Sequence, residues 1–147
     1  MSESRTLRIE RTFDAPAEAV FEAWTSEEVL RRWFHVDPDW ETPTAEVDLR
    51  VGGDLRVVMR DPSDGAEYGA RGSYTVVEPP SRLAMTWVWD DDPGNPQMIE
   101  LEFRERAGRT TVVMINSGIP TERQRESQEG GWTRCFVRLD GALTPSS

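Results

Sequence analysis

Three side chains that could bind a metal or exchange a proton stand close together in the first third of the sequence. His35, Asp37 and Asp39 form a His-x-Asp-x-Asp pattern around Pro38. An imidazole and two carboxylates can hold a divalent ion or act in general acid/base catalysis. Polar residues around a proline are, however, typical of any surface loop. We therefore predict a loop here and no metal site.

A run of aspartates and a single cysteine are the other reactive groups. Asp90-Asp91-Asp92 could bind calcium weakly, but the Pro93-Gly94 that follows indicates a solvated loop. Cys135 is the only cysteine, so an intramolecular disulfide is excluded and a small buried apolar side chain is expected. The sequence contains no nucleophile elbow, phosphate-binding glycine loop or metalloprotease motif. We assign no catalytic residue.

Aromatic and methionine side chains at alternating positions are the main signal for a binding site. Met85, Trp87 and Trp89 occupy every second position of one segment. Such side chains either fill a core or line a cavity for an apolar ligand. Tyr68 and Arg71 could anchor a polar group of that ligand, or face water. The candidates to line a cavity are Leu55, Val57, Met59, Tyr74, Met85, Trp87, Trp89, Leu101, Phe103, Met114, Trp132 and Phe136.

Most of these side chains fall in segments with the two-residue period of β-strands. A first strand is predicted near residues 6–13, and Gly52-Gly53 predicts a turn or sharp bend in the second third of the chain. Consecutive strands joined by short turns pair antiparallel. The alternation predicts further strands within 45–51, 55–59, 67–77, 83–89, 99–103 and 110–116.

Helical patterns occur in two places. Asp14 is predicted to cap a short helix, and Thr25 with Glu28 is predicted to form the capping box of a second one. A longer helix should begin at Thr121, with Gln124 as its capping partner. Its first half, 122–129, is polar, which indicates either a solvated face or, together with the acidic loop, the mouth of a cavity. Its apolar stripe is Trp132, Phe136, Leu139 and Leu143.

Composition limits the classes of function. A chain of 147 residues predicts a single domain, 1–147, and a net charge of −10 argues against nucleic acid as a partner. All 17 basic residues counted as Lys+Arg are arginines, which excludes Schiff-base chemistry and suits a GC-rich bacterial genome. No apolar run has membrane-spanning length, so we predict no membrane insertion, and the single cysteine suits a cytoplasmic location.

The order of elements predicts an α+β fold. A meander of about six or seven strands needs its apolar face covered, and the C-terminal helix is the only element large enough. We therefore expect a curved antiparallel sheet wrapped around a long C-terminal helix, with two short helices after the first strand.

Several short motifs follow one another along the chain: Val20-Phe21-Glu22-Ala23-Trp24-Thr25, Trp33-Phe34, Asp48-Leu49-Arg50-Val51-Gly52-Gly53, Gly72, Glu78-Pro79-Pro80-Ser81-Arg82-Leu83, Thr86-Trp87 and Gly131-Trp132. In this order they resemble the activator of Hsp90 ATPase homologue 1-like (AHSA1-like) family. This family belongs to the helix-grip superfamily of START and birch-pollen-allergen (Bet v 1-like, SRPBCC) proteins. The resemblance implies a cavity between sheet and terminal helix that takes apolar molecules, and no cofactor.

Three functions remain open. The leading hypothesis is a cytoplasmic protein that binds a small hydrophobic or amphipathic molecule in this cavity. The second is an enzyme, cyclase- or hydrolase-like, in which carboxylates or Tyr68, Tyr74 or His35 exchange protons with such a molecule. The third is a protein-interaction module like the Hsp90 activators. Exposed sheet edges would also allow a homodimer.

Overall fold

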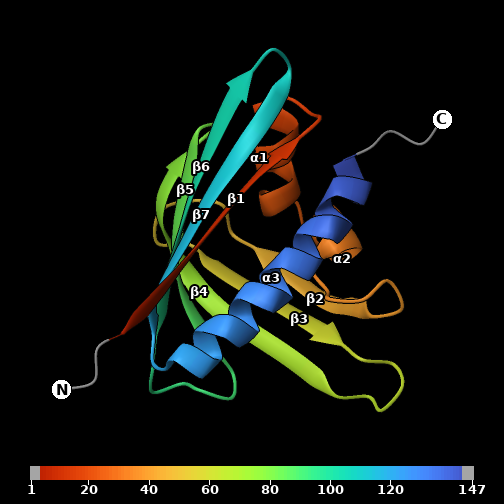
Figure 1. Cartoon of the computed structure of the whole chain (residues 1–147), viewed down its shortest axis with the longest axis vertical. Coiled ribbons are helices and arrows are strands. Elements are labelled where there is room, and N and C mark those ends of the chain that lie inside the picture. The colour runs from red at the N-terminus through yellow and green to blue at the C-terminus, as the bar shows by residue number, and fades with distance from the viewer. Residues whose placement is uncertain (1–3, 144–147) are drawn as a thin grey trace.

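The computed structural model describes residues 4–143, which form a sheet and three helices (Figure 1). The fold is α+β, as predicted, and the C-terminal helix is the longest element. In chain order the elements are β1 (Arg5–Phe13), α1 (Ala17–Thr25), α2 (Glu27–Trp33), β2 (Glu41–Val47), β3 (Asp54–Arg60), β4 (Glu67–Glu78), β5 (Arg82–Trp89), β6 (Gln97–Arg106), β7 (Arg109–Ile119) and α3 (Glu122–Leu143).

The sheet is a single antiparallel meander with one addition. Strands β2 to β7 follow one another in space as in sequence, and β1 pairs with β7, which gives the order β1-β7-β6-β5-β4-β3-β2. The sheet curves, and α3 runs across its open face while α1 and α2 lie near one of its ends (Figure 1). Helix α3 packs against α1, α2, β1 and β7. The predicted helix-grip arrangement is thus confirmed.

Strands β1 and β2 are the edges of this sheet. A homodimer formed through either edge stays a prediction. Among residues 4–143, no helix is both long and apolar enough to cross a membrane.

The predicted strand over 45–51 is partly wrong, because the second half of this segment is a loop. Strand β2 ends at Val47, and Leu49 and Val51 are 40% and 64% exposed. A close approach of the backbone to itself explains this loop, because a Cβ atom at Gly53 would lie 2.0 Å from the carbonyl oxygen of Asp48. The backbone folds back on itself before β3 begins, so the alternation of apolar residues at 47, 49 and 51 does not belong to a strand.

The helix caps differ from the predictions in two of three cases. Helix α1 begins after Pro16 without a side-chain cap from its own segment, and the Glu105 carboxylate accepts the amide hydrogen of Ala17 at 2.7 Å instead. Helix α2 is capped by Ser26, one residue later than predicted, while Thr25 bonds back to the α1 carbonyl of Phe21. A tertiary contact and a tight helix-to-helix junction thus replace the predicted local caps.

The cap of α3 is confirmed. The Thr121 hydroxyl accepts the amide hydrogen of Gln124 at 3.1 Å and lies 3.0 Å from the Gln124 side-chain oxygen.

An aromatic cluster joins the helices to the sheet. Trp132 of α3 lies 5.8 Å from Trp24 and from Phe34, and 5.5 Å from Trp87 of β5, measured between ring centroids. Such ring pairs each contribute about 0.5–1.5 kcal/mol beyond their buried area. The cluster fixes where α3 crosses the sheet, and two of its members, Phe34 and Trp132, line the pocket described next.

Candidate functional site

A pocket of about 600 Å³ lies between α3 and the end of the sheet formed by β3, β4 and β5. This volume falls within the range of small-molecule sites. The sheet side and the α2–β2 segment contribute Phe34, Val36, Trp40, Met59, Glu67, Tyr68, Gly69 and Trp89, and the β5–β6 loop contributes Asp90, Asp91 and Asp92. Helix α3 contributes Gln124, Glu126, Ser127, Gln128, Gly130, Gly131, Trp132, Arg134 and Cys135.

Aromatic rings line the pocket from its interior to its mouth. Phe34 and Trp132, 2% and 3% exposed, lie at the inner end. Trp40 and Tyr68 stack at the mouth with ring centroids 5.6 Å apart and an angle of 13° between the planes. Tyr68 is 45% exposed, so this stacked pair borders solvent. The lining suits a ligand with a flat or flexible apolar body.

Two consecutive glycines leave the helix wall of the pocket open. A Cβ atom at Gly130 would meet nothing within 4 Å, and one at Gly131 would meet only Val36 Cγ1 at 3.9 Å. Glycine in the interior of a helix costs stability relative to alanine. Because these two residues have no side chains, the space beside Trp132 is larger. The two glycines thus lower the stability of the helix but add to the volume of the pocket.

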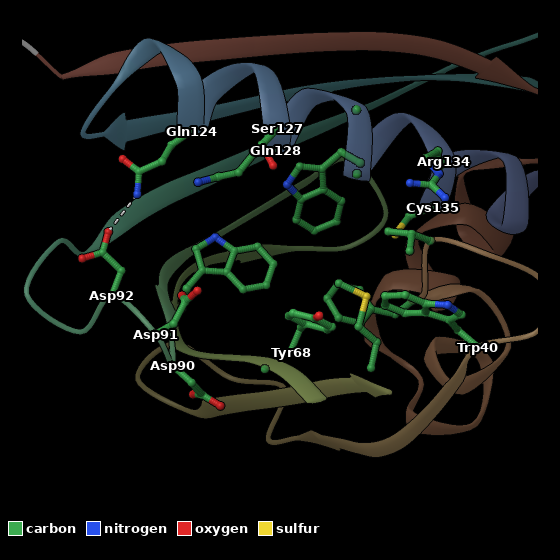
Figure 2. A pocket seen from close by; sticks show the side chains of 18 of the residues that line it. Trp40, Tyr68, Asp90, Asp91, Asp92, Gln124, Ser127, Gln128, Arg134 and Cys135 are labelled. Carbon is green, nitrogen blue, oxygen red and sulfur yellow. Dashed lines mark hydrogen bonds between the residues drawn. The ribbon is translucent and has the colours of Figure 1, made fainter. Parts of the chain in front are cut away.

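Polar groups surround the mouth. Figure 2 shows Asp92 turned toward Gln124 of α3, whose amide nitrogen donates to its carboxylate at 3.3 Å. Asp90 accepts two hydrogen bonds from the Arg56 guanidinium, at 2.6 and 2.8 Å. These bonds lower the pKa of the Asp90 carboxyl, so it stays ionised. The sequence left open whether the polar half of α3 is a solvated face or a cavity mouth, and the structure places it beside the acidic loop at the mouth.

Cys135 lies in the wall of the pocket, but its chemistry is suppressed. Burial raises the pKa of the thiol to about 12, so the thiol stays protonated near neutral pH. A protonated thiol is a poor nucleophile, and the residue acts here as an apolar lining group.

His35 lies outside the pocket wall, behind Phe34. It is 7% exposed, and its Nδ1 lies 3.0 Å from the Thr42 hydroxyl, which donates its own hydrogen to the Phe34 carbonyl. Thr42 must then accept from Nδ1–H, which places a proton on Nδ1. Burial, and then the charge of Arg138, lower the pKa of His35.

His35 and Asp37, two of the three residues around Pro38 that could exchange protons, have different partners. Asp37 pairs with Arg134 of α3 rather than with His35. Within residues 4–143, no group of three or more His, Cys, Asp or Glu side chains is arranged to hold a metal ion.

The structure brings only some of the predicted lining residues to the pocket. Met59, Trp89 and Trp132 line it, and so does Tyr68, one of the two proposed polar anchors. Arg71 is exposed on β4 and is not part of the wall. The part these residues play in ligand binding stays a prediction. The others are buried in the core: Leu55, Val57, Tyr74, Met85, Trp87, Leu101, Phe103, Met114 and Phe136.

Sequence reasoning missed Trp40 and the Gly130-Gly131 pair as parts of the pocket wall. Trp40 lies in a loop just before β2, and Tyr68 lies on β4. The two rings stack because β3 pairs with both β2 and β4, which the sequence pattern does not reveal. Gly130-Gly131 interrupts an otherwise helical pattern, which was an available signal, since such glycines usually have a packing or functional reason.

The indole N–H groups of Trp89 and Trp132 have no hydrogen-bond partner although both side chains line the pocket. A buried donor without an acceptor is unfavourable. A ligand with an ether, hydroxyl or carbonyl oxygen is therefore chemically suited to this wall.

Comparison with known proteins identifies relatives over most of the chain. The family described as "Activator of Hsp90 ATPase homolog 1-like protein" matches residues 14–144. A mouse protein named activator of 90 kDa heat shock protein ATPase homolog 1 is 24% identical over 131 residues, which cover 88% of this chain. The match covers 34% of the mouse protein, so this chain spans about a third of that relative.

Two bacterial crystal structures resemble the fold closely. A protein from Chromobacterium violaceum superposes with a TM-score of 0.87 at 23% identity, covering 96% of this chain and 99% of the other. The AHSA1 protein from Silicibacter pomeroyi gives a TM-score of 0.82 at 26% identity, with 95% and 97% covered.

Proposed function

The chain belongs to the activator of Hsp90 ATPase homolog 1-like family, and on that basis we propose that it binds a small hydrophobic or amphipathic molecule in the pocket beneath α3. The observation that carries this proposal is the 600 Å³ pocket between the aromatic sheet face and the Gly130-Gly131 segment of the helix. The single cysteine and acidic composition fit a cytoplasmic setting, which is part of the proposal.

Binding is driven by burial of the ligand's apolar surface against these rings. Each 100 Å² of apolar surface removed from water contributes about 2.5 kcal/mol. Part of that gain is offset by the ordering of ligand and side chains. A ligand of about 10 to 15 heavy atoms would therefore bind in the micromolar range.

Native mass spectrometry of gently purified protein tests the proposal. We expect a bound species that is released on denaturation, or, for protein obtained empty, saturable binding of the apolar fluorophore N-phenyl-1-naphthylamine. Gly131→Leu should abolish that binding, because the new side chain would project into the pocket beside Val36.

Gly141→Leu is the matched control. It makes the same substitution on the same helix, at an exposed glycine with open space around it that is not part of the pocket wall. Equal binding by the Gly131→Leu and Gly141→Leu variants would place the fluorophore elsewhere and contradict the proposal.

A second candidate function, binding to a chaperone, is favoured by the match to the mammalian activators. The exposed Leu49 and Val51, in the loop between β2 and β3, are apolar side chains that such a partner could cover. Stimulation of Hsp90 ATPase activity by this chain, lost in the Leu49→Ser/Val51→Ser variant, would support it. Stimulation that is absent, or unchanged in that variant, would count against it.

An enzymatic role is less well supported by the groups at hand. The pKa of Asp90 is lowered and that of Cys135 is raised to about 12, so both are moved away from the neutral range in which general acids and bases work. Tyr74 is buried in the core, where burial raises the pKa of its phenol.

A further inference from the structure

The mouth of the pocket is strongly acidic. Five carboxylates line the pocket, Glu67, Asp90, Asp91, Asp92 and Glu126, against one cation, Arg134. The single cation is already held by Asp37. Among the described residues of the wall, an anionic head group would thus meet five carboxylates and one arginine that is already paired. Arg71 and Arg125 act on Asp90 and Glu126 through their charges but are not part of the wall.

Internal ion pairs neutralise only part of this charge. Asp90 is paired with Arg56, and Glu67 lies 3.8 Å from Arg60. Within residues 4–143, no ion pair is made by Asp91, Asp92 or Glu126. Asp92 accepts from the amides of Gln124 and Asn95, which hold its carboxylate in place but leave its charge.

These three carboxylates come from two elements that border the pocket. Asp91 and Asp92 are on the β5–β6 loop and Glu126 is on the first half of α3. Figure 2 shows the loop carboxylates on one side of the pocket and the α3 side chains above them.

The aromatic walls favour the same kind of ligand. The faces of tryptophan and tyrosine rings carry negative potential and attract organic cations. Trp89, which directly precedes the acidic run in the chain, lines the pocket, and Trp40 and Tyr68 stack on the opposite side of the pocket from Asp91 and Asp92 (Figure 2). Aromatic faces and carboxylates line the same pocket, and each of these two interactions favours a positively charged ligand.

We propose that the pocket binds an organic cation, a molecule with an apolar body and a protonated amine or quaternary ammonium head. The body lies against Phe34 and Trp132, and the head lies at the acidic end of the pocket, near Asp91, Asp92 and Glu126, where Trp89 also belongs to the wall. This rests on the proposed function, that the pocket binds a small apolar molecule, and specifies the ligand's charge.

Three probes that share one ring system but differ in charge test the proposal by titration calorimetry. They are 1-naphthylmethylamine, 1-naphthalenemethanol and 1-naphthoate. One charge pair separated by about 6 Å at a solvated surface changes affinity about tenfold. We expect the amine to bind about tenfold more tightly than the alcohol, and the acid to bind most weakly. The amine's advantage should fall below about threefold in 0.5 M NaCl.

Paired variants separate the local charge from the net charge. Asp91→Asn/Glu126→Gln removes two charges at the mouth. Asp54→Asn/Glu100→Gln removes two exposed carboxylates that are not part of the pocket wall. The mouth variant should lose about tenfold in affinity for the amine and keep its affinity for the alcohol. The control variant should change both by less than twofold.

The outcomes distinguish this inference from the function on which it rests. If the alcohol and N-phenyl-1-naphthylamine bind but the acid binds as well as the amine, or the two variants weaken the amine equally, the cation preference is refuted and the binding function stands. If none of these probes binds, both fail.

Discussion

Alanine at Gly130 and Gly131 should make the protein more stable. Both residues lie in the interior of α3, where glycine is about 0.9 kcal/mol less favourable than alanine. A Cβ atom fits at either position, with only the 3.9 Å contact to Val36 at Gly131. Gly130→Ala/Gly131→Ala should therefore raise the free energy of unfolding by about 1.8 kcal/mol.

Urea unfolding followed by far-UV circular dichroism measures this gain. With a slope of about 2 kcal/mol per molar urea, the midpoint should rise by about 0.9 M. Tryptophan fluorescence is the less suitable signal, because Trp132 adjoins the mutated residues. Gly141→Ala is the control: it lies two residues before the last residue of the helix, Leu143, where fraying should reduce the gain.

A less stable Gly131→Ala protein would refute the reasoning, because it would mean that the helix packs against Val36 more tightly than 3.9 Å and that the pocket is closed there. The expected gain in stability should come with weaker binding of N-phenyl-1-naphthylamine, since each new methyl group occupies part of the pocket. Stability and binding would then change in opposite directions at the same residues.

Three further predictions concern single side chains. The pKa of His35 lies below its ordinary 6.5, so the unfolded chain binds the proton first as pH falls, and the free energy of unfolding should drop between about pH 7 and 5.5. Urea midpoints measured across this range should show the drop, and the His35→Gln variant should not. The Cys135 thiol, with a pKa of about 12, should react with Ellman's reagent at pH 8 at least about 100-fold more slowly than in urea, and a rate near that of a free thiol would contradict its burial. Gly72→Ala should cost about 3 kcal/mol by thermal unfolding, because its Cβ would lie 1.8 Å from the Thr86 carbonyl oxygen, whereas Gly94→Ala, in open space, should change little.

The fold followed from local patterns that the tertiary structure left intact. The alternation of Leu83, Met85 and Trp87 places these residues on one buried face of β5. The turn at Ala107-Gly108 has both residues at positive φ, 55° and 77°, as a tight hairpin between β6 and β7 requires. The alternation was misleading at Leu49 and Val51, which are exposed in a loop. There the chain folds back so that Gly53 comes close to the Asp48 backbone, and the spacing of apolar residues does not reveal such a contact.

The candidate site depended on contacts between distant parts of the chain. Met85 and Trp87 carry the same sequence signal as Met59 and Trp89, yet the first two lie in the core and the other two line the pocket. The spacing and type of the residues determine which face of a strand is apolar. The same pattern is found whether that face packs in a filled core or lines a cavity. Cavity volume depends on how far α3 stands from each strand.

The sequence by itself determined the α+β meander, the capped terminal helix and the acidic charge, because these depend on residue type and on neighbours within a few positions. Only the tertiary structure decided that the polar half of α3, the Gly130-Gly131 pair and the aspartates after β5 meet around one opening. That arrangement follows from the crossing of α3 over the sheet, which the packing of Trp132 against Trp24, Phe34 and Trp87 fixes.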